Sequence, residues 1–180
     1  MDLDDLQLVQ RARSDRRAGF DPLMQRYERL VYKVCSLYGP TRDDTLDITQ
    51  NVFLKVYKNL ASVKSEGMFK PWLLRITYNE SINWLRKRKV HEEFEELGEH
   101  DHAAENVNQE MRVLRKENQG LVLKGLQALN PKYKLAVSLR YAEGMRIREI
   151  ADVMECSEGM VKSLLFRGVR QIRNNVANLA

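Results

Sequence analysis

The chain has 180 residues, of which 31% are charged and 43% are hydrophobic, with nine glycines and four prolines. This length fits one ordinary domain or two small ones, and the shortage of helix-breaking residues favours an all-α protein over a sheet-rich or collagen-like one. No apolar run approaches the roughly 20 residues of a membrane span, and the acidic N-terminus lacks the basic stretch of a secretory signal. The sequence therefore predicts a folded cytoplasmic protein without membrane insertion.

Charge divides the chain into three blocks. Residues 1–90 carry 17 Lys and Arg against 11 Asp and Glu, residues 91–110 carry none against eight, and residues 111–180 carry 13 against six. The middle block has few apolar residues to anchor it, so we predict an acidic flexible linker between two small basic helical domains. Two basic domains favour a polyanionic partner, although charge by itself leaves nucleic acid and a membrane surface both open.

Apolar spacing and breaker residues predict the helices of the first domain. One helix runs from Leu3 and ends before Gly19. A second begins at Asp21 and Pro22, which fit an N-cap and a first helical position, and it ends at Gly39.

Two further helices complete residues 1–90. One begins near Asp43 and runs to Leu60, with a polar side. After a loop at 61–68, Pro71 opens another helix, which ends in the basic run 86–89.

In the second domain, residues 111–129 are predicted to form one helix. Asn130 and Pro131 cap the next, which ends at Gly144.

A helix-turn-helix is predicted after this point. A short helix at 147–154 is followed by a tight turn at 155–157, and Ser157 is the expected N-cap of the last helix. Glu155 stands where such turns often have Gly, at a cost of about 1 kcal/mol if the turn requires a positive φ.

The last helix separates an apolar stripe from a basic face. At about 100° per residue, the residues of the buried stripe are Val161, Leu164, Leu165, Gly168 and Ile172. The opposite face carries Lys162, Ser163, Phe166, Arg167, Arg170 and Arg173. Arg and Lys bind guanine edges or phosphates, and an apolar ring fits against a thymine methyl, so this face predicts binding to duplex DNA.

No catalytic or metal site is predicted. Cys35 and Cys156 lie far apart within apolar patterns, so we expect buried thiols rather than a disulfide or zinc site. His91, His100 and His102 lie in the linker, where a flexible backbone seldom holds a metal. The chain has no nucleophile motif or phosphate-binding loop, so we expect that it is not an enzyme and that it binds no cofactor.

Three motifs lie in order along the chain, at residues 47–53, at residues 69–76 with Asn79, and at residues 159–163 with Arg167. Together they resemble the motifs of the extracytoplasmic-function (ECF) sigma factors. The resemblance covers both domains. It implies an all-α protein with a sigma region 2 domain at 1–90, a linker at 91–110 and a sigma region 4 helix-turn-helix domain at 111–180. It further implies binding to the clamp helices and flap of core RNA polymerase and to promoter DNA.

The resemblance also assigns site residues. The polymerase contacts would be Asp44, Asp47 and Gln50. The upstream promoter element, read as duplex, would meet Lys162, Ser163, Phe166, Arg167 and Arg170. The downstream element, read as a melted strand, would meet Lys55, Ser62, Val63, Lys64, Phe69, Asn79, Asn83 and Arg86.

Two other functional classes fit the sequence less well than a sigma factor. A stand-alone helix-turn-helix regulator would use its first domain for dimerisation or sensing, but here that domain offers a polar helix, a polar loop and a basic end. A helical adaptor would leave the basic face of the last helix unexplained. Many ECF sigma factors are held by an anti-sigma factor, and a partner of this kind acting in trans is a hypothesis for this chain.

Overall fold

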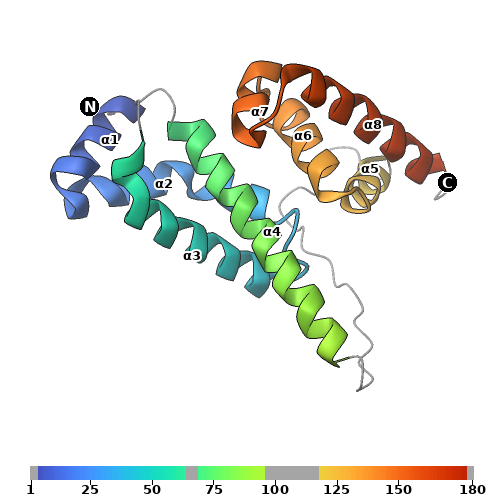
Figure 1. Ribbon diagram of the computed structural model, residues 1–180, viewed down its shortest axis with the longest axis horizontal. Helices are drawn as coiled ribbons and strands as arrows, with labels where there is room; N and C mark the ends of the chain where they lie inside the picture. The colour runs from blue at the N-terminus through green and yellow to red at the C-terminus, as the bar shows by residue number, and fades with distance from the viewer. Residues whose placement is uncertain (1–3, 64–68, 96–117, 178–180) are drawn as a thin grey trace. The chain divides into compact units, whose positions relative to one another are not determined.

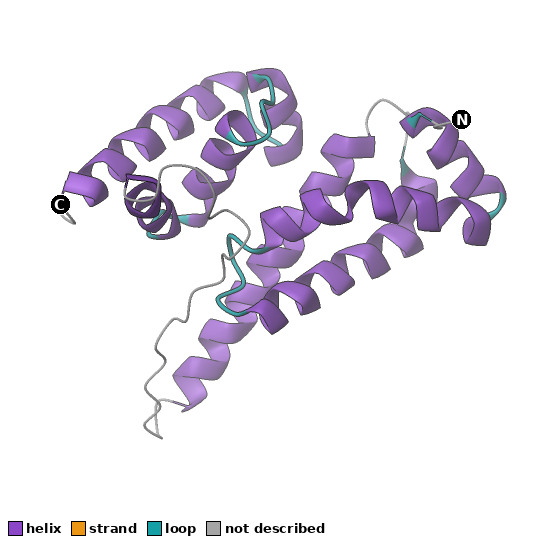
Figure 2. Ribbon diagram, turned by 180° about the vertical axis from the view of Figure 1, so that it is seen from behind, coloured by secondary structure: helices purple, strands orange, loops and turns teal. Residues whose placement is uncertain are grey.

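The computed structural model describes residues 4–63, 69–95 and 118–177. The chain divides into two compact units, Met1–Glu105 and Asn106–Ala180. Throughout the described ranges the regular structure is helical, which confirms the all-α prediction (Figures 1 and 2). The predicted linker lies outside the described residues from residue 96 onward, and the predicted domain limits stay a prediction.

The first unit is a bundle in which α1 packs on α2, α2 on α3, and α4 on both α2 and α3. Its elements are α1 (Asp5–Ser14), α2 (Arg16–Cys35), α3 (Arg42–Asn59), the short 3₁₀-helix η1 (Leu60–Ser62) and α4 (Phe69–Glu95).

The predicted start of the second helix is wrong. Helix α2 begins at Arg16, and both Gly19 and Pro22 lie inside it. A Cβ on Gly19 would lie 2.2 Å from the backbone nitrogen of Ala12, so this glycine permits close contact between α1 and α2 rather than ending a helix. Pro22 lacks an amide hydrogen and removes one backbone hydrogen bond, which the packing of the surrounding helix tolerates.

Local signals place α3 and α4 as expected at their starts. Thr41 caps α3 in a capping box with Asp44, close to the predicted start near Asp43. Pro71 lies in the first turn of α4, where its missing amide hydrogen has no helical partner. Helix α4 does not end in the basic run 86–89 but continues to Glu95.

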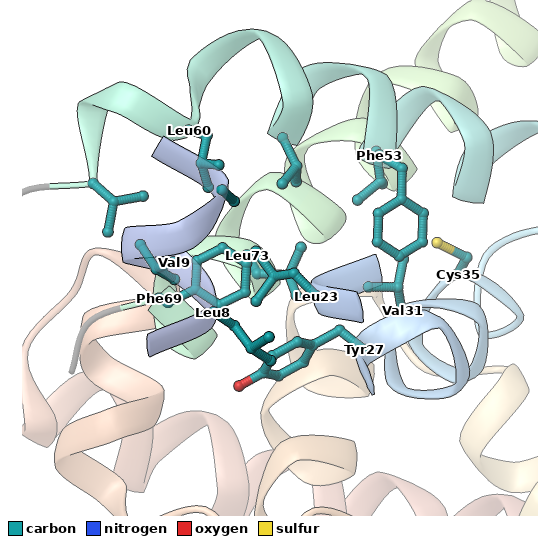
Figure 3. Close-up of a cluster of buried hydrophobic side chains, with 14 of the residues drawn as sticks. Leu8, Val9, Leu23, Tyr27, Val31, Cys35, Phe53, Leu60, Phe69 and Leu73 are labelled. Carbon is teal, nitrogen blue, oxygen red and sulfur yellow. The ribbon is translucent and has the colours of Figure 1, made fainter. Parts of the chain in front are cut away.

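A contiguous apolar core fills the first unit (Figure 3). Its members come from every helix of the unit and include Leu8, Val9, Leu23, Tyr27, Val31, Phe53, Leu60, Phe69 and Leu73. Burying each large apolar side chain contributes roughly 1.5 to 3 kcal/mol, so this core fixes the helices that carry the surface residues.

The cysteine thiols are free, and Cys35 is buried whereas Cys156 is half-buried. Burial raises the pKa of the Cys35 thiol to about 11, because the thiolate is poorly solvated there. The prediction of buried thiols is therefore confirmed for Cys35 and only in part for Cys156.

In the second unit, α5, α6 and α7 all pack against α8. The elements are α5 (Asn118–Gln127), α6 (Pro131–Tyr141), α7 (Ile147–Met154) and α8 (Glu158–Ala177). A Cβ on Gly168 would lie 2.8 Å from the Val137 Cγ2 atom, so glycine permits close contact of α8 with α6.

The predicted caps of the second unit are confirmed. Asn130 accepts a hydrogen bond from the Lys132 amide at 3.1 Å, and the Ser157 hydroxyl accepts one from the Met160 amide at 3.2 Å. Helix α7, a turn and α8 form the predicted helix-turn-helix. None of the described helices is long and apolar enough to cross a membrane.

Candidate nucleic-acid interface

The exposed face of α8 is the first candidate surface. Phe166 is 71% exposed, and Lys162, Arg167 and Arg170 are exposed beside it, whereas Ser163 is half-buried. On the opposite side Val161, Leu164 and Gly168 are buried, while Leu165 and Ile172 are half-buried. The helix therefore separates an apolar side from a cationic side carrying one aromatic ring, as its periodicity predicts.

The turn before α8 sets the direction of this face. Glu155 adopts a left-handed conformation with φ 50°, which confirms that the turn uses a positive φ at a residue other than glycine. Ser157 then caps α8. Met160, which the sequence analysis did not single out, is also exposed, and a Cβ on Gly159 would meet only the Ser157 hydroxyl, at 3.9 Å.

The polar side of α3 is the second candidate surface. Asp47 and Gln50 are exposed there. Asp44 is half-buried, and its carboxylate accepts hydrogen bonds from the Thr41 amide at 3.2 Å and the Thr41 hydroxyl at 2.6 Å. Of the three predicted polymerase contacts, Asp44 is thus already used to start the helix.

Exposed apolar side chains accompany these polar ones. Leu54 is 56% exposed, and Leu46 and Tyr57 are also exposed. Helical geometry puts Leu54 within about 40° of both Asp47 and Gln50. Helical periodicity predicted Tyr57 on the apolar side and did not identify the exposed Leu54. In the structure the Tyr57 ring lies at the surface and packs edge-on against Phe20, with the ring centroids 5.0 Å apart.

The residues predicted for the downstream element come from α3, η1 and α4. Lys55 of α3 pairs with Glu80 of α4, and Asn83 lies within 3.4 Å of the same carboxylate oxygen. Asn79 and Arg86 are exposed on α4. The structure thus joins Lys55 and Asn83 through Glu80, a residue that sequence reasoning missed.

The loop residues of the predicted base pocket separate into different environments. Ser62 is exposed, and its hydroxyl donates to the Asn59 carbonyl at 2.7 Å. Val63 is buried, with its carbonyl accepting a hydrogen bond from Arg13, and Lys64 lies outside the described residues.

Phe69 belongs to the core rather than to the surface. It is 2% exposed, and its ring lies 5.2 Å from the Tyr27 ring and 5.9 Å from the Trp72 ring, among the core side chains of Figure 3. A ring buried in this way offers no face on which a base could stack. The structure therefore gives the side chains of Phe69 and Val63 a packing role, because the apolar ring and the valine complete the core next to the loop.

These features define a helical protein of two units with a helix-turn-helix in the second. Sigma-70 region 2 matches residues 23–90, and Sigma-70, region 4 matches residues 119–172. The chain is 30% identical to an ECF RNA polymerase sigma-E factor of Haemophilus influenzae, over 98% of this chain and 97% of that protein. It is 33% identical to the RNA polymerase sigma-H factor of Pseudomonas aeruginosa, over 91% and 89%.

The chain belongs to the ECF sigma factor family. Sigma factors are transcription initiation factors and not enzymes. Among solved structures, the sigma factor RpoE of Bartonella quintana, in complex with the anti-sigma factor NepR, has the same fold, with a TM-score of 0.72 and 19% identity over 88% of this chain and 96% of that one.

Proposed function

We propose that this protein binds core RNA polymerase in the cytoplasm and directs it to promoters by reading an upstream element as duplex and a downstream element as a melted strand. The observation that carries the proposal is the exposed face of α8, where Phe166 stands 71% exposed among cations. Family membership supplies the polymerase as the partner.

The upstream element is read in the major groove by α8. This groove admits an α-helix, and each base pair presents a distinct pattern of donors, acceptors and methyl groups there. Lys162, Ser163 and Arg167 supply hydrogen bonds, Phe166 supplies the apolar contact and Arg170 reaches a phosphate.

The downstream element is bound by the unit that contains α3 and α4. Unpairing DNA without ATP must be offset by holding the unpaired strand, and cations and amides suit that task. The exposed contacts are Lys55, Ser62, Asn79, Asn83 and Arg86. Lys64 stays in this proposal from the sequence alone, and Val63 and Phe69 support the loop from the core.

Polymerase binding is assigned to α3 for the clamp helices and to the second unit for the flap. Asp47 and Gln50 present a carboxylate and an amide to a basic partner, and the exposed Leu54 adds an apolar contact between them. Asp44 stays in the proposed surface with its carboxylate held by Thr41.

An anti-sigma factor acting in trans fits this arrangement. The sigma factor of Bartonella quintana was solved with an anti-sigma factor, and CnrH was solved with the cytosolic domain of CnrY. A partner that covers the exposed side of α3 would prevent polymerase binding. Copurification from the native cell without any small protein partner would contradict this part of the proposal.

The proposal is tested by transcription from a genomic fragment library with purified bacterial core RNA polymerase, with and without the protein, followed by sequencing of the transcript starts. We expect new discrete starts that share paired upstream and downstream elements. If no new start appears and the protein instead footprints duplex DNA without polymerase, the stand-alone regulator is the correct function.

A further inference from the structure

A carboxylate lies at the centre of the proposed downstream surface, although acidic groups repel nucleic acid. Glu80 of α4 pairs with the Lys55 ammonium from α3, and the Asn83 amide nitrogen lies 3.4 Å from the same Glu80 oxygen. Lys55 and Asn83 are strand contacts in the proposed function, and the acid that joins them has no role in it so far.

The carboxylate is far less exposed than its partners. The Lys55 side chain is 51% exposed and the Glu80 side chain 13%, while Asn83 is exposed. A strand that reaches this surface therefore meets the ammonium and the amide rather than the carboxylate.

Both partners keep hydrogen-bonding capacity that Glu80 does not use. An ammonium has three donors, so Lys55 can bond to Glu80 and to a phosphate at once. A carboxylate only accepts hydrogen bonds, so Asn83 turns its NH₂ group to Glu80 and keeps its carbonyl oxygen for another partner. A carbonyl fixed in this position accepts from the amino or imino N–H groups on the Watson–Crick edge of an unpaired base and cannot donate to a base's ring nitrogen or carbonyl oxygen, so it favours bases that place an N–H group there.

We propose that Glu80 is a positioning residue that sets the base preference of the downstream surface by fixing Lys55 and orienting the Asn83 amide. The inference rests on the proposed function. Without the Glu80 charge, the Asn83 amide is free to rotate and to present its donor and its acceptor alternately, which reduces the distinction between bases.

The test uses Glu80→Gln, which keeps the side-chain size and removes the charge. The protein is assembled with core RNA polymerase, and fluorescence anisotropy measures the binding of two labelled single-stranded oligonucleotides. One carries the downstream element found by sequencing transcript starts, and the other carries the same bases in scrambled order. We expect the ratio of the two affinities to fall about tenfold in Glu80→Gln.

Three controls separate positioning from a loss of structure or of overall charge. Glu28→Gln removes the same charge from an exposed position on α2 and leaves the ratio unchanged. Thermal unfolding and binding of the upstream duplex are measured on every variant, and both stay at the wild-type value in Glu80→Gln. In Asn83→Ala, the amide is absent, so adding Glu80→Gln changes the ratio much less than it does alone.

An unchanged ratio in Glu80→Gln would overturn the inference, and so would an equal effect of Glu80→Gln with and without the Asn83 amide. If the wild-type complex already binds both oligonucleotides equally, the proposed reading of a melted strand fails instead. The two failures are therefore distinguishable in one experiment.

Discussion

The two proposed DNA-binding surfaces are built in different ways. The upstream surface lies on one helix, α8, so its members are related by helical spacing alone. The downstream surface takes residues from α3, η1 and α4, and the contact between Lys55 and Glu80 bridges two helices. A surface on one helix depends on the exposure of that helix, whereas a surface from several elements depends on how the core packs them.

The largest effect is expected from reversing a charge on α3. Asp47→Arg places a cation against a basic polymerase surface, where like charges cost several kcal/mol, so association with core polymerase is lost. Gel filtration or pull-down with core polymerase measures the loss.

Two control measurements show whether the effect of Asp47→Arg is confined to the proposed polymerase surface. Glu28→Arg makes the same charge change on α2 and retains association, and upstream duplex binding by Asp47→Arg stays intact because α8 belongs to the other unit. Normal association of Asp47→Arg with polymerase would remove Asp47 from the interface.

Overpacking the contact between α1 and α2 tests whether the downstream surface, which is built from several elements, depends on the packing of the core. Gly19→Ala places a Cβ 2.2 Å from the Ala12 nitrogen, which forces the helices apart and destabilises the first unit by about 3 kcal/mol. Urea unfolding measures this change, and binding of the melted strand weakens with it.

Gly159→Ala is the matched control for Gly19→Ala. Its Cβ meets only the Ser157 hydroxyl, at 3.9 Å, so we expect a gain of roughly 0.5 to 1 kcal/mol from helix propensity. Equal stability of Gly19→Ala and the wild type would mean that the two helices do not need their close contact.

Removing one cation from α8 tests the upstream surface. Arg167→Ala is expected to weaken upstream duplex binding by roughly 1 to 3 kcal/mol if the residue contacts a base, and to leave polymerase association unchanged. Electrophoretic mobility shift with the upstream element measures the loss, and Arg29→Ala removes the same charge from an exposed site on α2. A loss of polymerase association by Arg167→Ala would contradict the division between the units.

The smallest effect is expected in the turn of the helix-turn-helix. Glu155→Gly replaces a side chain held at φ 50° by the residue that adopts this conformation freely, and we expect a stabilisation of about 1 kcal/mol. Thermal unfolding of the second unit measures it. A decrease in stability would show that the contacts of the Glu155 side chain outweigh its backbone strain.

The sequence alone was sufficient to predict those features that depend on a single helix or turn. The exposed and buried sides of α8, the Ser157 cap and the positive φ at Glu155 all follow from local spacing and turn chemistry. These features can be predicted without knowing the neighbouring helices, since hydrogen bonds within a few residues and helical periodicity indicate them.

Tertiary structure decided the features that depend on a distant neighbour. Gly19 was predicted to end a helix, but α1 packs against it and makes glycine necessary inside α2. Phe69 was predicted to face a base, but Tyr27 and Trp72 enclose its ring. Glu80 was not singled out, because its partner Lys55 is 25 residues away in the chain and only the packing of α3 on α4 brings them together. Local rules report propensity and periodicity, whereas burial and pairing are properties of the folded core.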